Sequence, residues 1–143
     1  MQVHQISIFL ENRVGRLQEV TEVLARHDIN IRALSLADTS DFGILRLIVN
    51  KPAEAVRILR DSGFTVREND VLAVEVDDRP GGLARILKLF SQAAISVEYM
   101  YAFVERHSGN AVMIFRVESL PRAIKALQDA GIVLLSDEQV CSL

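Results

Sequence analysis

The sequence carries one short loop pattern twice, and this duplication constrains the fold more than any other feature. An acid or amide, Arg, any residue, Gly, any residue and Leu occur at Asn12–Leu17 and again at Asp78–Leu83, 66 residues later. Further along, the offset is 68, as between Gly63 and Gly131, so the second copy has two extra residues in its central turn. A repeat of this length predicts two duplicated small domains rather than a solenoid.

The order of hydrophobic periods is the same in both copies. Alternating apolar residues predict strands at 3–10, 30–37, 42–49 and 64–66 in the first copy, and at 71–76, 95–104, 111–117 and 132–135 in the second. Helical spacing predicts helices at 15–27, 52–62, 80–93 and 121–130. We expect a hairpin turn at 38–41 and a short linker at 67–70.

Each copy therefore has the order βαββαβ, which is the ferredoxin-like plan. The expected fold class is α+β, with two such units side by side, antiparallel sheets, and the helices on one face of each sheet. The expected domains are residues 1–68 and 69–143.

Composition excludes several classes of protein. The 143 residues carry a net charge of −3 with no basic stripe, which argues against a nucleic-acid partner. No apolar run approaches the roughly 20 residues that span a bilayer, and no signal peptide is visible. The single cysteine, Cys141, fits a reducing compartment, so we expect a cytoplasmic protein without membrane contact.

No residue pattern indicates catalysis, a metal or a cofactor. The three histidines, His4, His27 and His107, lack metal-ligand spacing among themselves or with Cys141. No nucleophile or base recurs at matched positions of the two copies. We expect a protein that is not an enzyme and that binds no cofactor.

The duplicated loop suits a small zwitterion. A polar residue at a strand end, followed by Gly where a helix begins, leaves free backbone N–H groups beside a side-chain acceptor. Two plainer interpretations stay open: the glycines serve only a tight turn, and Asn12 and Asp78 are helix caps. Arg13 and Arg79 are expected to be solvated loop residues or salt-bridge partners across the boundary between the two units.

These residues resemble tandem ACT domains. The resemblance rests on the loops at 11–17 and 77–83, on Ile29-Asn30-Ile31 at the start of a strand with Ile95-Ser96-Val97 as its weaker counterpart, and on the duplicated βαββαβ order. ACT domains are regulatory modules that bind amino acids, commonly at the seam between two units. The resemblance implies a stand-alone sensor of a free L-amino acid.

The resemblance also assigns ligand-binding positions. Asn12 and Asp78 would anchor the ligand, the glycines would admit it to the backbone, and Asn30 and Ser96 would complete the sites across the seam. The implied residues are Asn12, Arg13, Val14, Gly15, Arg16, Leu17, Asn30 and Ile31 in the first copy, and Asp78, Arg79, Pro80, Gly81, Gly82, Leu83, Ser96 and Val97 in the second.

Two departures from the family pattern bear on specificity. Some serine-sensing ACT domains have histidine two residues before the loop polar residue, where this chain has Leu10 and Val76. Val14 replaces the more usual proline of the first loop, so we expect the two sites to differ in affinity.

The sequence leaves room for functions other than a sensor. The alternative is a regulatory subunit that acts by protein contact on an amino-acid biosynthetic enzyme such as acetohydroxyacid synthase. An acylphosphatase-like enzyme and an RNA-binding sheet fit less well, since the phosphate loop and the aromatic strand pair are missing.

The aromatic residues of the second copy suggest an interface. Tyr99, Tyr101 and Phe103 alternate along one predicted strand and therefore share a face. They form either an exposed patch opposite the helices or part of the core beneath the helices. The first interpretation predicts a homodimer through sheet packing.

Overall fold

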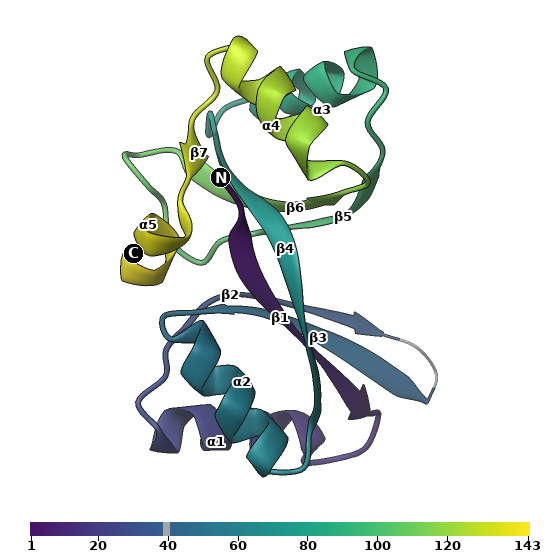
Figure 1. Ribbon diagram of the computed structural model, residues 1–143, viewed down its shortest axis with the longest axis vertical. Helices are drawn as coiled ribbons and strands as arrows, with labels where there is room; N and C mark the ends of the chain where they lie inside the picture. Colours follow the sequence, from purple (N-terminus) through teal and green to yellow (C-terminus); the bar gives the residue numbers. More distant parts are fainter. Residues whose placement is uncertain (39–40) are drawn as a thin grey trace. The chain divides into compact units, whose positions relative to one another are not determined.

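The computed structural model describes residues 1–38 and 41–143 and divides into two compact units. The first unit is His4–Asn69, and the second is Asp70–Leu143 with Met1–Val3. Each unit has the βαββαβ order with its helices on one face of an antiparallel sheet, which confirms the predicted fold class (Figure 1). The side-by-side arrangement and the boundary after residue 68 stay predictions.

The first unit has a sheet in which β2 is at one edge. Its elements are β1 (Val3–Glu11), α1 (Arg16–Arg26), β2 (Ile31–Asp38), β3 (Phe42–Val49), α2 (Pro52–Asp61) and the first part of β4 (Thr65–Val76). The strand order is β2-β3-β1, with β4 next to β1. Leu45 of β3 lies opposite Ile8 of β1 and Leu36 of β2. The predicted turn at 38–41 includes residues 39–40, which lie outside the described residues.

The second unit repeats this topology. Its elements are the remainder of β4, α3 (Gly82–Gln92), β5 (Val97–Ala102), β6 (Ala111–Val117), α4 (Leu120–Asp129), β7 (Leu134–Leu135) and the short helix α5 (Asp137–Ser142). The strand order is β5-β6-β4-β7. In both units the first strand therefore lies in the interior of the sheet, and the duplicated loop follows the end of that strand.

Each unit has its own hydrophobic core beneath its pair of helices. Leu59 of α2 and its repeat counterpart Leu127 of α4 are both fully buried. In the second unit, Phe90 of α3 packs edge-to-face on Phe115 of β6 with ring centroids 5.3 Å apart. None of the helices in the described part of the chain is long and apolar enough to cross a membrane.

Strand β4 shows that the predicted strand break and the predicted linker are both wrong. The sequence predicted separate strands at 64–66 and 71–76 joined by a linker at 67–70, but one strand runs from Thr65 to Val76. The polar residues stay extended because neighbouring side chains hold them. The Ser7 hydroxyl donates to Asn69 Oδ1 at 2.7 Å, and the Arg67 guanidinium lies 5.7 Å from the centroid of the Phe9 ring.

Two aromatic residues of β5, Tyr99 and Tyr101, and Phe103 just after it do not form an exposed patch. Tyr101 and Phe103 are only 9% and 8% exposed, and Tyr99 is half-buried. Met100, between the two tyrosines, packs against the core beneath α3 and α4. The exposed-patch interpretation is therefore wrong, and its argument for a sheet-packed homodimer falls with it.

Helix α5 was missed by sequence analysis. Ser136 and Gln139 form a reciprocal capping box, in which each side chain accepts a hydrogen bond from the backbone N–H of the other residue. Val140 of this helix is fully buried. The Ser-x-x-Gln spacing was a readable signal for this helix start.

We expect Ser136→Ala to lower the free energy of unfolding by about 1 kcal/mol, because the N-cap acceptor is lost. Urea denaturation followed by circular dichroism measures the change. Ser142→Ala removes a serine from the other end of α5, where its hydroxyl only donates to carbonyls, and should change stability less. Equal effects of the two substitutions would contradict the role of the capping box.

Candidate functional site

Both duplicated loops enter their helices through a left-handed glycine. Gly15 has φ 90° and Gly81 has φ 87°, in the region that side chains other than glycine rarely adopt. A Cβ built on either glycine would have no neighbour within 4 Å. The glycines are therefore required by backbone conformation and not by crowding.

The two loops share one hydrogen-bond pattern. The Arg13 N–H donates to Glu11 O at 2.9 Å, and the Glu19 N–H donates to Gly15 O at 3.0 Å. In the second loop Arg79 donates to Asp77 at 2.9 Å, and Arg85 donates to Gly81 at 3.0 Å. The duplication therefore extends from residue spacing to backbone geometry.

The glycine, not the loop acid or amide, occupies the N-cap of each helix. Gly15 and Gly81 have no side chain that could accept a capping hydrogen bond. Because they are the N-cap residues, the interpretation of Asn12 and Asp78 as helix caps is wrong. In the described residues, the next N–H groups have no backbone acceptor. These groups belong to Leu17 and Gln18 in α1 and to Leu83 and Ala84 in α3. First-turn N–H groups of this kind favour a carboxylate.

A hollow of about 150 Å³ borders the first loop. The loop contributes Asn12 and Arg13, α1 contributes Leu17, and the neighbouring strands contribute Leu36 and Gly43. Its wall thus combines polar loop atoms with aliphatic side chains from three elements. Leu10 and Glu11 complete the lining.

The arginines of the first loop serve mainly structural contacts. The Arg16 guanidinium lies 4.6 Å from the centroid of the Phe64 ring and 2.7 Å from a Glu19 carboxylate oxygen. The Arg16 side chain is only 17% exposed. Arg13 Nε lies 3.6 Å from a carboxylate oxygen of Glu11 in the same loop, and a salt bridge across the boundary between the units stays a prediction. Val14 is fully exposed at the tip of the loop.

The second loop differs in packing and charge. Gly82 occupies the position that Arg16 has in the first loop. A Cβ on Gly82 would lie 2.0 Å from Asp77 O, so no side chain fits at this position. Arg79 pairs with Asp77 at 3.1 Å. The Asp78 carboxylate forms an ion pair with Arg106, which lies in the turn between β5 and β6.

Each loop is thus contacted by the turn between the second and third strands of its own unit. In the first unit the Asn12 N–H donates to Asp41 O of the turn at 2.9 Å. In the second unit Arg106 of the turn forms the ion pair with Asp78 of the loop. Sequence reasoning missed Asp41 and Arg106. The two-residue difference in turn length was the available signal that these turns differ.

The residues at the start of β2 and β5 lie at the other end of their own units. The Asn30 N–H donates to Asn50 Oδ1 at 2.9 Å, and Ile31 pairs with Val49, whereas Glu11 pairs with Phe42. The Ser96 N–H likewise donates to Glu118 at 3.2 Å, beside the pair of Val97 and Val117. Within one unit these residues do not join the loop, and their part in a site across the seam stays a prediction.

The remaining loop residues frame the helix starts. Pro80 is exposed and precedes Gly81, while Leu83 is half-buried and packs against the core of the second unit. Among the described residues, no group of three or more His, Cys, Asp or Glu side chains could hold a metal ion. The chemistry offered by the loops is therefore that of backbone N–H groups, an amide and a carboxylate.

The fold and loops define a duplicated ferredoxin-like protein with a helix start that lacks a side-chain cap in each unit. The chain belongs to the family described as the ACT domain pair, whose model matches residues 1–143. This is a regulatory type of domain, and the resemblance inferred from the sequence is confirmed. No curated protein matches the chain.

Solved structures agree with this assignment. The chain is similar to a protein from Bacteroides thetaiotaomicron, with 40% identity over 100% of this chain and 98% of the other and a TM-score of 0.94. The regulatory subunit of aspartate kinase from Thermus thermophilus is 16% identical, over 89% and 91% of the two chains, with a TM-score of 0.63. Aspartate kinase from Synechocystis is 18% identical, over 95% and 28%, with a TM-score of 0.58. The last two share the fold.

The clash at Gly82 predicts an unequal response of the two loops to alanine. We expect Gly82→Ala to destabilise the protein by more than about 3 kcal/mol, because backbone must move away from the new Cβ. Gly15→Ala should cost about 1 kcal/mol, since it strains φ in open space. Urea denaturation compares the two variants, and an equal or smaller loss in Gly82→Ala would contradict the geometry of the second loop.

Proposed function

We propose that this protein is a regulatory sensor that binds a free L-amino acid at its duplicated loops and performs no catalysis. Its family is regulatory, and two proteins of the same fold are an aspartate kinase and a regulatory subunit of aspartate kinase. The proposal includes a cytoplasmic location, which rests on the lone cysteine Cys141.

The free N–H groups after the left-handed glycines carry this proposal. The N–H groups of Leu17 and Gln18 have no backbone acceptor in the described residues and lie at the positive end of the α1 dipole. An amino-acid carboxylate matches them in charge and geometry. The ammonium group of the same ligand would then meet the polar residue at the strand end, Asn12 or Asp78.

The two loops should not bind equally. Asn12 offers a neutral amide beside a hollow with aliphatic walls, which suits the side chain of the ligand. Asp78 offers a stronger partner for ammonium, but Arg106 already neutralises it. We therefore propose that the first loop is the primary site.

A thermal-shift screen with the twenty L-amino acids tests the sensor. A ligand at about 100 times its dissociation constant should add about 2.7 kcal/mol to the free energy of unfolding, which raises the melting temperature by several degrees. Asn12→Ala should abolish most of the shift. Asp61→Ala, an exposed acid on α2, is the matched control. If no amino acid raises the melting temperature, the sensor function is wrong, and the protein-contact alternative becomes the next test.

Removing the cation beside Asp78 should strengthen the second site. We expect Arg106→Ala to free the Asp78 carboxylate for the ligand ammonium and to lower the dissociation constant about tenfold, as for a gained charge-assisted hydrogen bond. Isothermal titration calorimetry measures this change. The double variant Arg106→Ala/Asp78→Ala should lose the gain, and a gain that persists there would contradict the competition between Arg106 and the ligand.

A further inference from the structure

The hollow beside the first loop has walls made of leucine side chains. Leu10 of β1 is buried, whereas Leu17 of α1 and Leu36 of β2 are 42% and 51% exposed. Leu36 lies opposite Leu45, a core residue beneath the helices, so Leu36 faces the helix side of the sheet. Two of the three leucines therefore present apolar atoms to solvent, and a ligand that covers these atoms gains free energy.

Gly43 of β3 leaves space between these walls. It carries no side chain, and a Cβ built on it would lie 3.3 Å from Leu36 Cδ1 and 3.4 Å from Ala37 O. A methyl group at this position would therefore take part of the space that borders Leu36. The hollow of about 150 Å³ is smaller than the pockets of roughly 300 Å³ or more that hold drug-sized ligands, so it suits a side chain of few atoms.

The charged residues that line the hollow are already paired with each other. The Glu11 carboxylate lies 3.6 Å from Arg13 Nε and 3.9 Å from Arg16 Nη2. The remaining polar residue of the lining, Asn12, is the proposed partner of the ligand ammonium. Among the described residues that line the hollow, none has a hydroxyl group. The lining therefore favours an apolar side chain over a charged or hydroxylated one.

The walls of the hollow differ from their repeat counterparts in the second unit. Leu36 corresponds to Ala102, and Gly43 corresponds to Ala111. Ala102 is too short to form the outer wall, and the methyl group of Ala111 stands where the first unit has open space. The features that would select an aliphatic side chain are therefore specific to the first loop.

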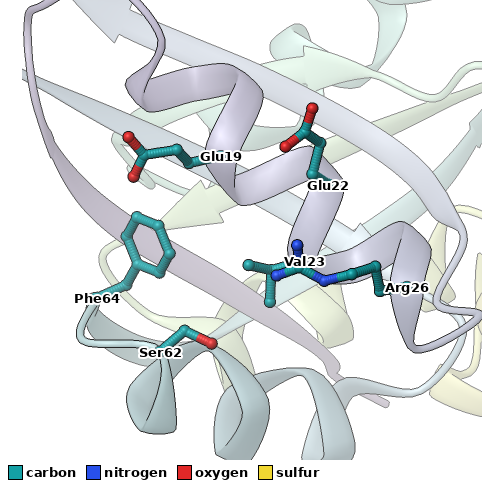
Figure 2. A pocket seen from close by; sticks show the side chains of 6 residues that line it. All are labelled: Glu19, Glu22, Val23, Arg26, Ser62 and Phe64. Carbon is teal, nitrogen blue, oxygen red and sulfur yellow. The ribbon is translucent and has the colours of Figure 1, made fainter.

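A second hollow of the first unit, of about 210 Å³, has a different lining. Figure 2 shows Glu19, Glu22 and Arg26 of α1 around the apolar side chains of Val23 and Phe64. The three charged groups would lose water against an aliphatic ligand, which disfavours such a ligand there. The leucine walls therefore distinguish the hollow beside the first loop.

We propose that the first loop selects L-amino acids with a branched aliphatic side chain, such as leucine, isoleucine and valine. This inference rests on the proposed function, because it uses the same site. The ligand carboxylate meets the N–H groups of Leu17 and Gln18, and its ammonium meets Asn12. The ligand side chain then enters the space beside Gly43. Leu17 and Leu36 come from different elements, so a branched side chain contacts both.

Isothermal titration calorimetry with pairs of ligands of similar shape tests this selectivity. Valine has a methyl group where threonine has a hydroxyl group, and leucine has two methyl groups where asparagine has an amide. We expect valine to bind at least about tenfold more tightly than threonine, and leucine at least about tenfold more tightly than asparagine. Threonine or asparagine that binds as tightly as its aliphatic match would overturn the selectivity but leave the sensor function in place. The absence of binding by any amino acid would overturn both.

Substitutions in the walls locate the selectivity. Leu36→Ala introduces the residue of the second unit and should weaken leucine binding about tenfold, with little change in the binding of alanine as a ligand. Gly43→Ala should also lower the ratio of leucine affinity to alanine affinity, because the new methyl group takes space near Leu36. A substitution that acted only through the structure of the loop would weaken both ligands alike.

Leu34→Ala is the matched control. Leu34 lies on the same face of β2 as Leu36 and is similarly exposed, but it is not among the residues that line the hollow. Circular dichroism establishes that each variant keeps its fold. An equal loss of leucine affinity in Leu34→Ala, or an unchanged ratio of leucine affinity to alanine affinity in Leu36→Ala, would overturn the proposal.

Discussion

The structure depends on a conformational constraint at the junction between the first strand and first helix of each unit. Gly15 and Gly81 adopt a left-handed φ, which turns the chain sharply and lets the helix begin without a side-chain cap. A capping serine or aspartate would satisfy the first-turn N–H groups internally. The glycine leaves them open, so local backbone geometry creates the feature that a carboxylate ligand can use.

The two copies of the loop have kept this backbone and diverged in their side chains. Arg16 fills the position after the glycine in the first unit and stacks on Phe64, whereas Gly82 stands so close to Asp77 that no side chain fits. The charged groups also differ, since Asp78 has its own cation in Arg106. Duplication therefore supplied one scaffold twice, and substitution made the two loops chemically distinct.

The duplication made the fold predictable from the sequence, because each helix or strand could be recognised in both copies of the repeat. The strands 42–49 and 111–117 were predicted with the observed bounds. The failures have physical causes. Residues 67–70 are polar and resembled a linker, but Asn69 is held by Ser7, a contact that spans 62 residues. The pair of Asp78 and Arg106 was equally out of reach, because spacing does not show which turn folds onto which loop.

The central claim is that an amino acid binds at the uncapped helix starts, and a ¹H–¹⁵N NMR titration tests it most directly. An equimolar mixture of the twenty L-amino acids would be added to the labelled wild-type protein. The account predicts that the amide resonances of Gly15, Leu17 and Gln18 shift first, followed at higher concentration by those of Gly81 and Leu83. Shifts confined to other residues, or no shifts at all, would contradict it.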